Sequence, residues 1–341
     1  MSAKRHNRQK RPVGKQGGHA RLFGLGIEQS ATLERRCQCL HCARKRKSRD
    51  AGVLSLGVGT VVRFPLNWGV NAKACSRDGR FTGKAVSMPY AINQGIRIHY
   101  QVEGSGPPLV LQHGFFWSVE GWYRVGYVDA LRTSYRLILV DARGHGASDK
   151  PHDGAAYSLP QHVADIVAVL DALYLPKAHF WGYSMGGWFG FGMAKHAAAR
   201  VDSLIIGGSH PYGRRLPVAS RPDGADPEAF LDTLFQRMEL DRAAFSPAEE
   251  AEYLDNDFRA LAASYQDRPS LEDILPTMTM PCLLYVGGED DYFSPQVQSC
   301  VGHIPQGRFV SIPGVNHSEA FYRAELVLPH AMNFLQTVAK S

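Results

Sequence analysis

From residue 88 onward, apolar and polar residues follow one another in a regular order. Residues 96–102 alternate between the two classes, as in a strand with one exposed face. Short apolar runs follow, and their length is typical of buried strands. These runs cover 109–111, 137–140, 178–181, 203–206, 282–286 and 308–312.

Helical patterns separate these runs. Within 158–173, Val163, Ile166 and Leu170 share helical spacing, and Pro160 suits the first turn of a helix. Short apolar strands that alternate with amphipathic helices predict an α/β fold, with a mainly parallel central sheet and helices on both faces. Because such sheets place ligands beyond the carboxyl ends of their strands, we expect the chemistry there.

The pattern changes over about residues 208–280. Several prolines lie near the start of this segment, and helical patterns follow at about 230–240 and 247–264. We interpret the segment as a small helical cap, inserted over the edge of the sheet, that shapes a substrate pocket. A plain surface excursion is the alternative.

Residues 1–87 differ in their charge from the body of the chain at 88–341. They contain 19 Lys and Arg against 4 Asp and Glu, whereas the body contains 19 against 28. We expect a basic, disordered extension, which an upstream start would also explain, because Met88 precedes the first strand pattern. A targeting segment and a basic arm are the alternatives. Aromatic residues are sparse there, which disfavours nucleic acid as a partner.

The cysteines fit a reducing compartment, and we expect a cytoplasmic protein. Four of the six lie in the extension, where Cys37, Cys39 and Cys42 crowd around His41. Their spacing is not that of two separate pairs of zinc ligands, so we predict no metal. No apolar run is long enough to cross a membrane.

A serine between two glycines carries the chemistry. The segment 182–186 reads Gly-Tyr-Ser-Met-Gly, after the apolar run 178–181 and before the helix-like run 188–199. A sharp turn between a strand and a helix lifts the hydroxyl of Ser184 clear of the sheet, and the glycines let the chain bend that tightly. We therefore predict that Ser184 is a nucleophile.

A serine hydroxyl needs a base, and the base needs an acid that orients it. In this kind of fold the order along the chain is serine, acid, histidine. His317 follows the last strand pattern, and Asp290 and Asp291 follow the run 282–286. The residues themselves leave the choice between the two aspartates open.

The body resembles the α/β-hydrolase superfamily, in its esterase, lactonase and cofactor-free haloperoxidase-like branch. The resemblance covers about 90–338 and rests on five motifs in order. They are His113-Gly114-Phe115, the loop 141–149, the serine turn, the aspartate loop and the histidine loop. It implies a Ser184–His317–Asp291 triad, because the acid of the family usually follows a glycine by three positions and precedes a proline by four. Gly288 and Pro295 meet both conditions for Asp291.

The resemblance also implies an oxyanion hole formed by the backbone N–H groups of Phe115 and Met185. We expect Phe116, Trp117 and Trp188 to line an apolar substrate pocket. No cluster of Arg or Lys converges there in the sequence, so a phosphate-rich substrate is disfavoured.

The expected function is hydrolysis of a small or medium apolar carboxylic ester or lactone through an acyl-enzyme intermediate, without a cofactor. The same triad could instead cleave a carbon–carbon bond or act as a cofactor-free haloperoxidase or perhydrolase. A non-catalytic binding module is the remaining alternative.

Overall fold

The computed structural model describes residues 53–56, 60–63, 90–215, 226, 229–230, 232 and 253–340 of the 341-residue chain. The chain divides into two units, Met1–Val86 and Ser87–Ser341. In the first unit, β1 (Val53–Leu56) and β2 (Thr60–Arg63) pair antiparallel, a hairpin that the sequence pattern does not predict. The rest of the predicted extension, and the cap helix predicted at about 230–240 apart from residues 230 and 232, lie outside the described residues.

The second unit contains an eight-stranded sheet. Its spatial order is β10-β9-β8-β7-β5-β6-β4-β3, and all neighbours from β10 to β6 run parallel, whereas β4 pairs antiparallel with both β6 and β3. The mainly parallel sheet is therefore confirmed. The strands are β3 (Tyr90–Asn93), β4 (Ile96–Glu103), β5 (Pro108–Gln112), β6 (Arg136–Val140), β7 (Ala178–Tyr183), β8 (Val201–Gly207), β9 (Cys282–Gly287) and β10 (Gly307–Ile312).

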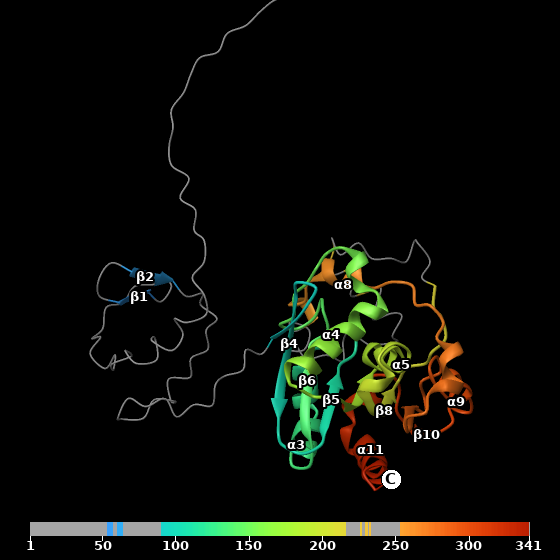
Figure 1. Ribbon diagram of the computed structural model, residues 1–341. Coiled ribbons are helices and arrows are strands. Elements are labelled where there is room, and N and C mark those ends of the chain that lie inside the picture. The colour runs from blue at the N-terminus through green and yellow to red at the C-terminus, as the bar shows by residue number, and fades with distance from the viewer. Residues whose placement is uncertain are drawn as a thin grey trace, which may run out of the picture. The chain divides into compact units, whose positions relative to one another are not determined.

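Helices cover both faces of this sheet (Figure 1). The helices α4 (Leu159–Ala172), α5 (Met185–His196) and α9 (Ser294–Val301) share one buried cluster with one face. The helices α2 (Val119–Arg124), α3 (Tyr127–Leu131), α10 (Glu319–Tyr322) and α11 (Ala324–Val338) share a second cluster with the other. The described part of the unit also contains short 3-10 helices: η2 (Gly154–Tyr157), η3 (Ala198–Arg200) and η6 (Glu272–Thr277).

The strand residues show why two layers form. Successive side chains of a strand point to opposite faces of its sheet. Val110 of β5 accordingly belongs to the cluster under α4 and α5, whereas Leu109 and Leu111 belong to the cluster under α2 and α11. Strands that are apolar at every position are thus buried on both sides, as the apolar runs in the sequence predict.

Helix α4 begins where its sequence pattern predicts. The side chain of Gln161 accepts a hydrogen bond from the backbone N–H of Ser158, which forms one half of a capping box, and Pro160 occupies the first turn. The helix then directs Val163, Ile166 and Leu170 into the core. Its start is important for the site because Ser158, Leu159 and Pro160 line the cavity described below.

The inserted segment between β8 and β9 lies at the carboxyl end of the parallel strands. Its described helix, α8 (Phe258–Ser264), stands beyond the tip of β5 (Figure 1). Phe258 and Leu261 of α8 pack with Phe116 from the loop after β5 and with Phe230. The inserted segment is therefore joined to the loop after β5 by a largely aromatic cluster of its own. Among the described helices, none is both long and apolar enough to traverse a bilayer.

Candidate active site

Ser184 occupies a sharp turn between β7 and α5. Its backbone has φ 51° and ψ −108°, a left-handed conformation that is uncommon for a residue with a side chain. A Cβ atom added at Gly182 would lie 2.1 Å from the carbonyl oxygen of Gly186, and one added at Gly186 would lie 2.2 Å from the carbonyl oxygen of Gln112. The two glycines are therefore required for the backbone to pass this closely.

His317 lies on the loop after β10 and reaches Ser184. Its Nε2 atom is 3.1 Å from the Ser184 hydroxyl oxygen, although 133 positions separate the two residues. The imidazole ring stacks on Phe293, with ring centroids 4.5 Å apart and planes inclined by 19°. The fold thus brings together Ser184 and His317, the two residues that the sequence predicts as nucleophile and base.

The carboxylate that pairs with His317 is Asp290, and the choice of Asp291 was wrong in this respect. Oδ2 of Asp290 is 2.8 Å from Nδ1 of His317, and Asp290 is buried, whereas Asp291 is exposed. The backbone explains the difference. The N–H of Asp290 donates to the carbonyl of Gly287, and Oδ1 of Asp290 accepts from the N–H of Phe293. This turn directs the side chain of Asp290 inward.

The pairing assigns the proton of the imidazole. A carboxylate only accepts hydrogen bonds, so Nδ1 of His317 donates to Asp290 and Nε2 is left to accept from Ser184. In this state the serine hydroxyl faces a free electron pair of the base. The arrangement can transfer a proton from Ser184 to His317 as the oxygen attacks a carbonyl.

Tyr183, inside the serine turn, supports the histidine loop. Its hydroxyl donates to the backbone carbonyl of His317. Burial, together with the nearby Tyr285 and Asp290, raises the pKa of Tyr183 well above its ordinary value, so the phenol remains a donor at neutral pH. The sequence reasoning did not identify this residue, since nothing in the pattern distinguishes its hydroxyl from any other buried tyrosine.

The two residues predicted as oxyanion donors both lie at the cavity wall. Met185 is the first residue of α5, where backbone N–H groups lack a partner within the helix. Phe115 follows Gly114, and a Cβ atom added at Gly114 would lie 3.5 Å from Cβ of Ser184. The loop therefore passes beside the nucleophile, and the donor role of these two N–H groups remains a prediction.

His113 holds that loop in place. Its Nε2 accepts from the N–H of Ala142, and its Nδ1 donates to the carbonyl of Gly114 at 2.7 Å. Burial lowers the pKa of His113, which keeps the ring neutral and suited to this mixed role. Asp141 supports the same region, because it accepts from His99 and from the backbone of Val119. The hydrogen bonds of both residues thus hold the loop after β5 against the loop after β6.

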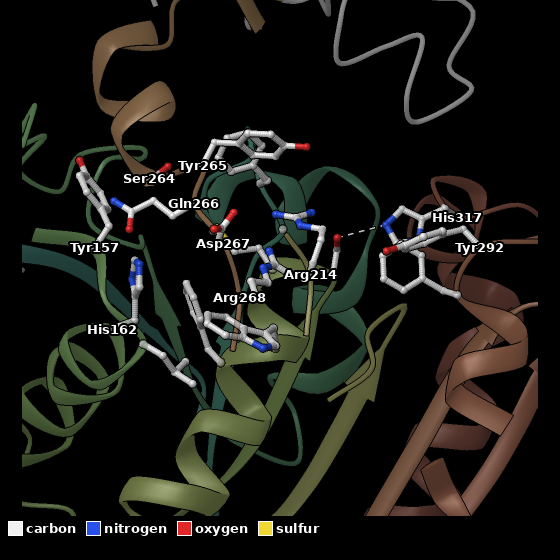
Figure 2. A pocket seen from close by; sticks show the side chains of 18 of the residues that line it. Tyr157, His162, Arg214, Ser264, Tyr265, Gln266, Asp267, Arg268, Tyr292 and His317 are labelled. Atoms are coloured by element: carbon white, nitrogen blue, oxygen red, sulfur yellow. Dashed lines mark hydrogen bonds between the residues drawn. The ribbon is translucent and has the colours of Figure 1, made fainter. Parts of the chain in front are cut away.

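A cavity of about 590 Å³ opens beside Ser184 (Figure 2). Trp117 and Trp188 line it, as predicted, and so does Phe115. Phe116 does not, and its prediction as a pocket residue was wrong. With φ 70° its backbone directs the side chain into the cluster that it forms with Phe230 and Phe258, where it is only 5% exposed.

The cavity also contains a group of cations that the sequence reasoning did not expect. Arg214, Arg215 and Arg268 are among its lining residues. Arg214 and Arg268 come from distant parts of the inserted segment, and an isolated antiparallel bridge joins their backbones. No local sequence pattern predicts that these two arginines pair. Within the described part of the chain, no group of three or more His, Cys, Asp or Glu residues could hold a metal ion.

Several known proteins are similar to about two thirds or more of this chain. A pimeloyl-[acyl-carrier protein] methyl ester esterase of Xanthomonas campestris is 29% identical over 257 residues, which cover 67% of this chain and 95% of that protein. The crystal structure of an enol-lactonase from Burkholderia xenovorans superposes with a TM-score of 0.64 at 24% identity and covers 73% of this chain and 100% of that one. A bromoperoxidase from Bacillus anthracis gives a TM-score of 0.60 at 23% identity, with 72% and 98% covered.

The family comparison agrees with the architecture. A family model described as the alpha/beta hydrolase fold matches residues 107–279, about half of the chain. That range includes the loop after β5, the serine turn and most of the inserted segment. By this match and by its mainly parallel sheet, the chain belongs to the α/β-hydrolase superfamily.

Proposed function

We propose that this protein is a serine hydrolase that cleaves a small or medium carboxylic ester or lactone through an acyl-enzyme intermediate. One observation carries the proposal. Ser184, His317 and Asp290 form a continuous chain of hydrogen bonds, 3.1 Å and 2.8 Å long, and the serine lies at the wall of a cavity lined by aromatic rings.

The first half of the reaction forms the acyl-enzyme. Oγ of Ser184 attacks the carbonyl carbon of the substrate while Nε2 of His317 takes the hydroxyl proton. The backbone N–H groups of Met185 and Phe115 bind the oxyanion that develops on the carbonyl oxygen. His317 then gives its proton to the departing alkoxide, which leaves as an alcohol, or stays attached when the substrate is a lactone.

The second half returns the enzyme to its starting state. His317 removes a proton from a water molecule, and the resulting hydroxide attacks the ester carbonyl of the acylated Ser184. The proton passes from His317 to Oγ of Ser184, and the carboxylic acid product is released. Throughout, Asp290 holds the imidazole in one orientation and stabilises its positive charge.

The names of similar proteins support a reaction of this class. They include a methyl ester esterase and an enol-lactonase. A bromoperoxidase is also similar in fold. A peroxidase of this fold could use the same serine. Hydrogen peroxide, in place of water, would then attack the acyl-enzyme, and this is the alternative reaction to test.

Labelling with a fluorophosphonate probe and hydrolysis of short p-nitrophenyl esters test the proposal. We expect Ser184→Ala to abolish both while the variant keeps the circular dichroism and melting temperature of the wild type. Full ester turnover by this variant would refute the proposal. Ester turnover should also exceed oxidation of a halide probe in acetate and peroxide, and the reverse order would favour the peroxide reaction.

A further inference from the structure

Two arginines of the cavity wall face each other across a backbone bridge. The N–H of Arg214 donates to the carbonyl of Arg268 at 2.9 Å, and the N–H of Arg268 donates to the carbonyl of Arg214 at 2.8 Å. Residues that exchange both bonds in this way are direct neighbours, with their side chains on the same side of the bridge. The fold thus brings two guanidinium groups together in the cavity (Figure 2).

Aromatic rings hold these guanidinium groups. The Cζ atom of Arg268 lies 4.9 Å from the ring centre of Trp188, and that of Arg214 lies 5.0 Å from the ring centre of Tyr265. A ring fixes the position of a guanidinium and leaves its N–H groups available to a planar anion. Nε of Arg214 is buried and has no hydrogen-bond partner among the residues that the structure describes.

Among the residues that the structure describes, neither guanidinium forms an ion pair with a carboxylate. Asp290, the buried carboxylate of the cavity, is already paired with His317. Asp267, Glu289 and Asp291 also line the cavity, but they are exposed to solvent.

The charge of the two arginines shifts pKa values within this group of residues. Burial and the neighbouring Arg214 lower the pKa of Arg268 to about 9. Burial together with both arginines lowers the pKa of His210 to about 4. Like charges placed directly opposite each other destabilise a bridge. An anion bound between the guanidinium groups would remove that repulsion.

We propose that Arg214 and Arg268 bind a carboxylate of the substrate, so that the ester or lactone cleaved at Ser184 carries a free carboxylate away from the scissile bond. That this anion belongs to a substrate of Ser184 rests on the proposed function. That the two arginines bind a carboxylate does not. Such a molecule has an apolar part between its scissile ester and its free carboxylate. Trp188 and Phe115 would contact this apolar part. Figure 2 shows the arginines between His317 on one side and His162 on the other.

A paired set of substrates tests the assignment. The monomethyl esters of the straight-chain dicarboxylic acids from succinic to suberic acid are compared with their terminal amides, which have nearly the same shape and no charge. We expect kcat/KM for the best acid to exceed that for its amide by about tenfold or more, mainly through KM, since hydrogen bonds to a charged group are stronger than those to a neutral one.

Variants then connect the preference to the two residues. In Arg268→Gln and Arg214→Gln the ratio of the two kcat/KM values should fall by about tenfold, and Arg268→Lys should lie between them and the wild type. Arg259→Gln, on the exposed face of α8, is the matched control and should leave the ratio unchanged. An acid-to-amide ratio near one at every chain length, or one that neither substitution alters, would overturn the assignment.

A binding measurement separates this inference from the hydrolase proposal. Adipate is titrated calorimetrically into Ser184→Ala protein, with adipamide as the neutral control. Binding of adipate alone, lost when Arg268→Gln is added, supports the anion site even if no ester is hydrolysed. Equal binding of both compounds, or binding of neither, contradicts the anion site even if Ser184 hydrolyses neutral esters.

Discussion

Nδ1 of His317 lies 2.8 Å from Oδ2 of Asp290, while the adjacent Asp291 is exposed. Two neighbouring carboxylates of the same loop thus have different surroundings. Asp290 is held from both sides, because its other oxygen accepts the N–H of Phe293 and its own N–H donates to Gly287. The loop therefore offers one acid to the imidazole and leaves the other in water.

The difference between the two aspartates predicts unequal effects of the same substitution. Asp290→Asn should lower kcat for ester hydrolysis by about 10³–10⁴-fold, because the amide no longer holds the imidazole in the productive tautomer. Asp291→Asn should change kcat by less than about twofold, since an exposed surface group contributes little. Both are measured by steady-state hydrolysis of one p-nitrophenyl ester. A larger loss in Asp291→Asn would restore Asp291 as the acid.

The serine turn predicts a steric effect on stability. A Cβ atom at Gly182 would lie 2.1 Å from the backbone oxygen of Gly186, which no side-chain movement can relieve. Gly182→Ala should lower the free energy of unfolding by about 3 kcal/mol or more. Gly302 serves as the control, because it has helical φ and ψ and the nearest atom to an added Cβ is 4.0 Å away.

Gly302→Ala should therefore change stability by no more than about 0.5 kcal/mol. Both variants are compared with the wild type by urea denaturation followed by far-ultraviolet circular dichroism. A well-folded Gly182→Ala protein with an unchanged midpoint would show that the turn can relax, contrary to the close approach of the two backbones.

Much of the fold follows from sequence pattern alone. The apolar runs predict strands β5 to β10 to within about two residues, because a strand buried on both faces has few polar positions. The runs carry no comparable signal for β3, which has an exposed isoleucine at Ile92, 60% accessible. The short helices α2 and α3 were likewise not predicted, since two turns are too few for a helical period to show.

The candidate site was predicted less completely, for physical reasons. Ser184 and His317 each belong to a motif that follows the end of a strand, and the position of that strand in the sheet fixes where the residue lies. The family spacing favoured Asp291 over Asp290, whereas backbone bonds within the loop decide which carboxylate turns inward. Phe116 was misplaced because its positive φ reverses the direction of its side chain. The pairing of Arg214 with Arg268 depends on the fold of the whole inserted segment.

A buried ion pair links the loop after β6 to helix α4, and its loss should be costly. Nε and one terminal nitrogen of Arg143 each lie 2.7 Å from an oxygen of Asp165, and both residues are 2% exposed. Asp165→Asn should destabilise the protein by about 3–5 kcal/mol, because it leaves the guanidinium buried without its counter-ion.

The exposed pair Arg323–Glu325 is the matched control for this substitution. Glu325→Gln should leave the unfolding midpoint within experimental error, since water screens an exposed pair. Thermal unfolding of both variants, followed by circular dichroism, checks the contrast. Equal and small effects would mean that the surroundings of Arg143 rearrange to solvate its charge.

His210 should make stability depend on pH. Burial, Arg268 and Arg214 lower its pKa from 6.5 to about 4, with Asp290 acting weakly in the opposite direction, and its Nδ1 accepts the N–H of Tyr212. Between these two pKa values the unfolded chain binds a proton that the folded protein does not. The stabilisation is therefore complete above about pH 6.5 and is lost as the pH falls toward 4, by up to about 1.4 kcal/mol per pH unit.

Replacing the imidazole isolates this contribution. In His210→Asn the side-chain oxygen can still accept from Tyr212 but does not titrate, so the slope of unfolding free energy between pH 4.5 and 6 should fall by about 1 kcal/mol per pH unit. His303→Gln, at an exposed histidine, should retain the wild-type slope. Urea denaturation at several pH values gives these slopes. If His210→Asn kept the slope of the wild type, His210 would have to be protonated in the folded protein, and the positive charge of Arg214 and Arg268 would have to be compensated.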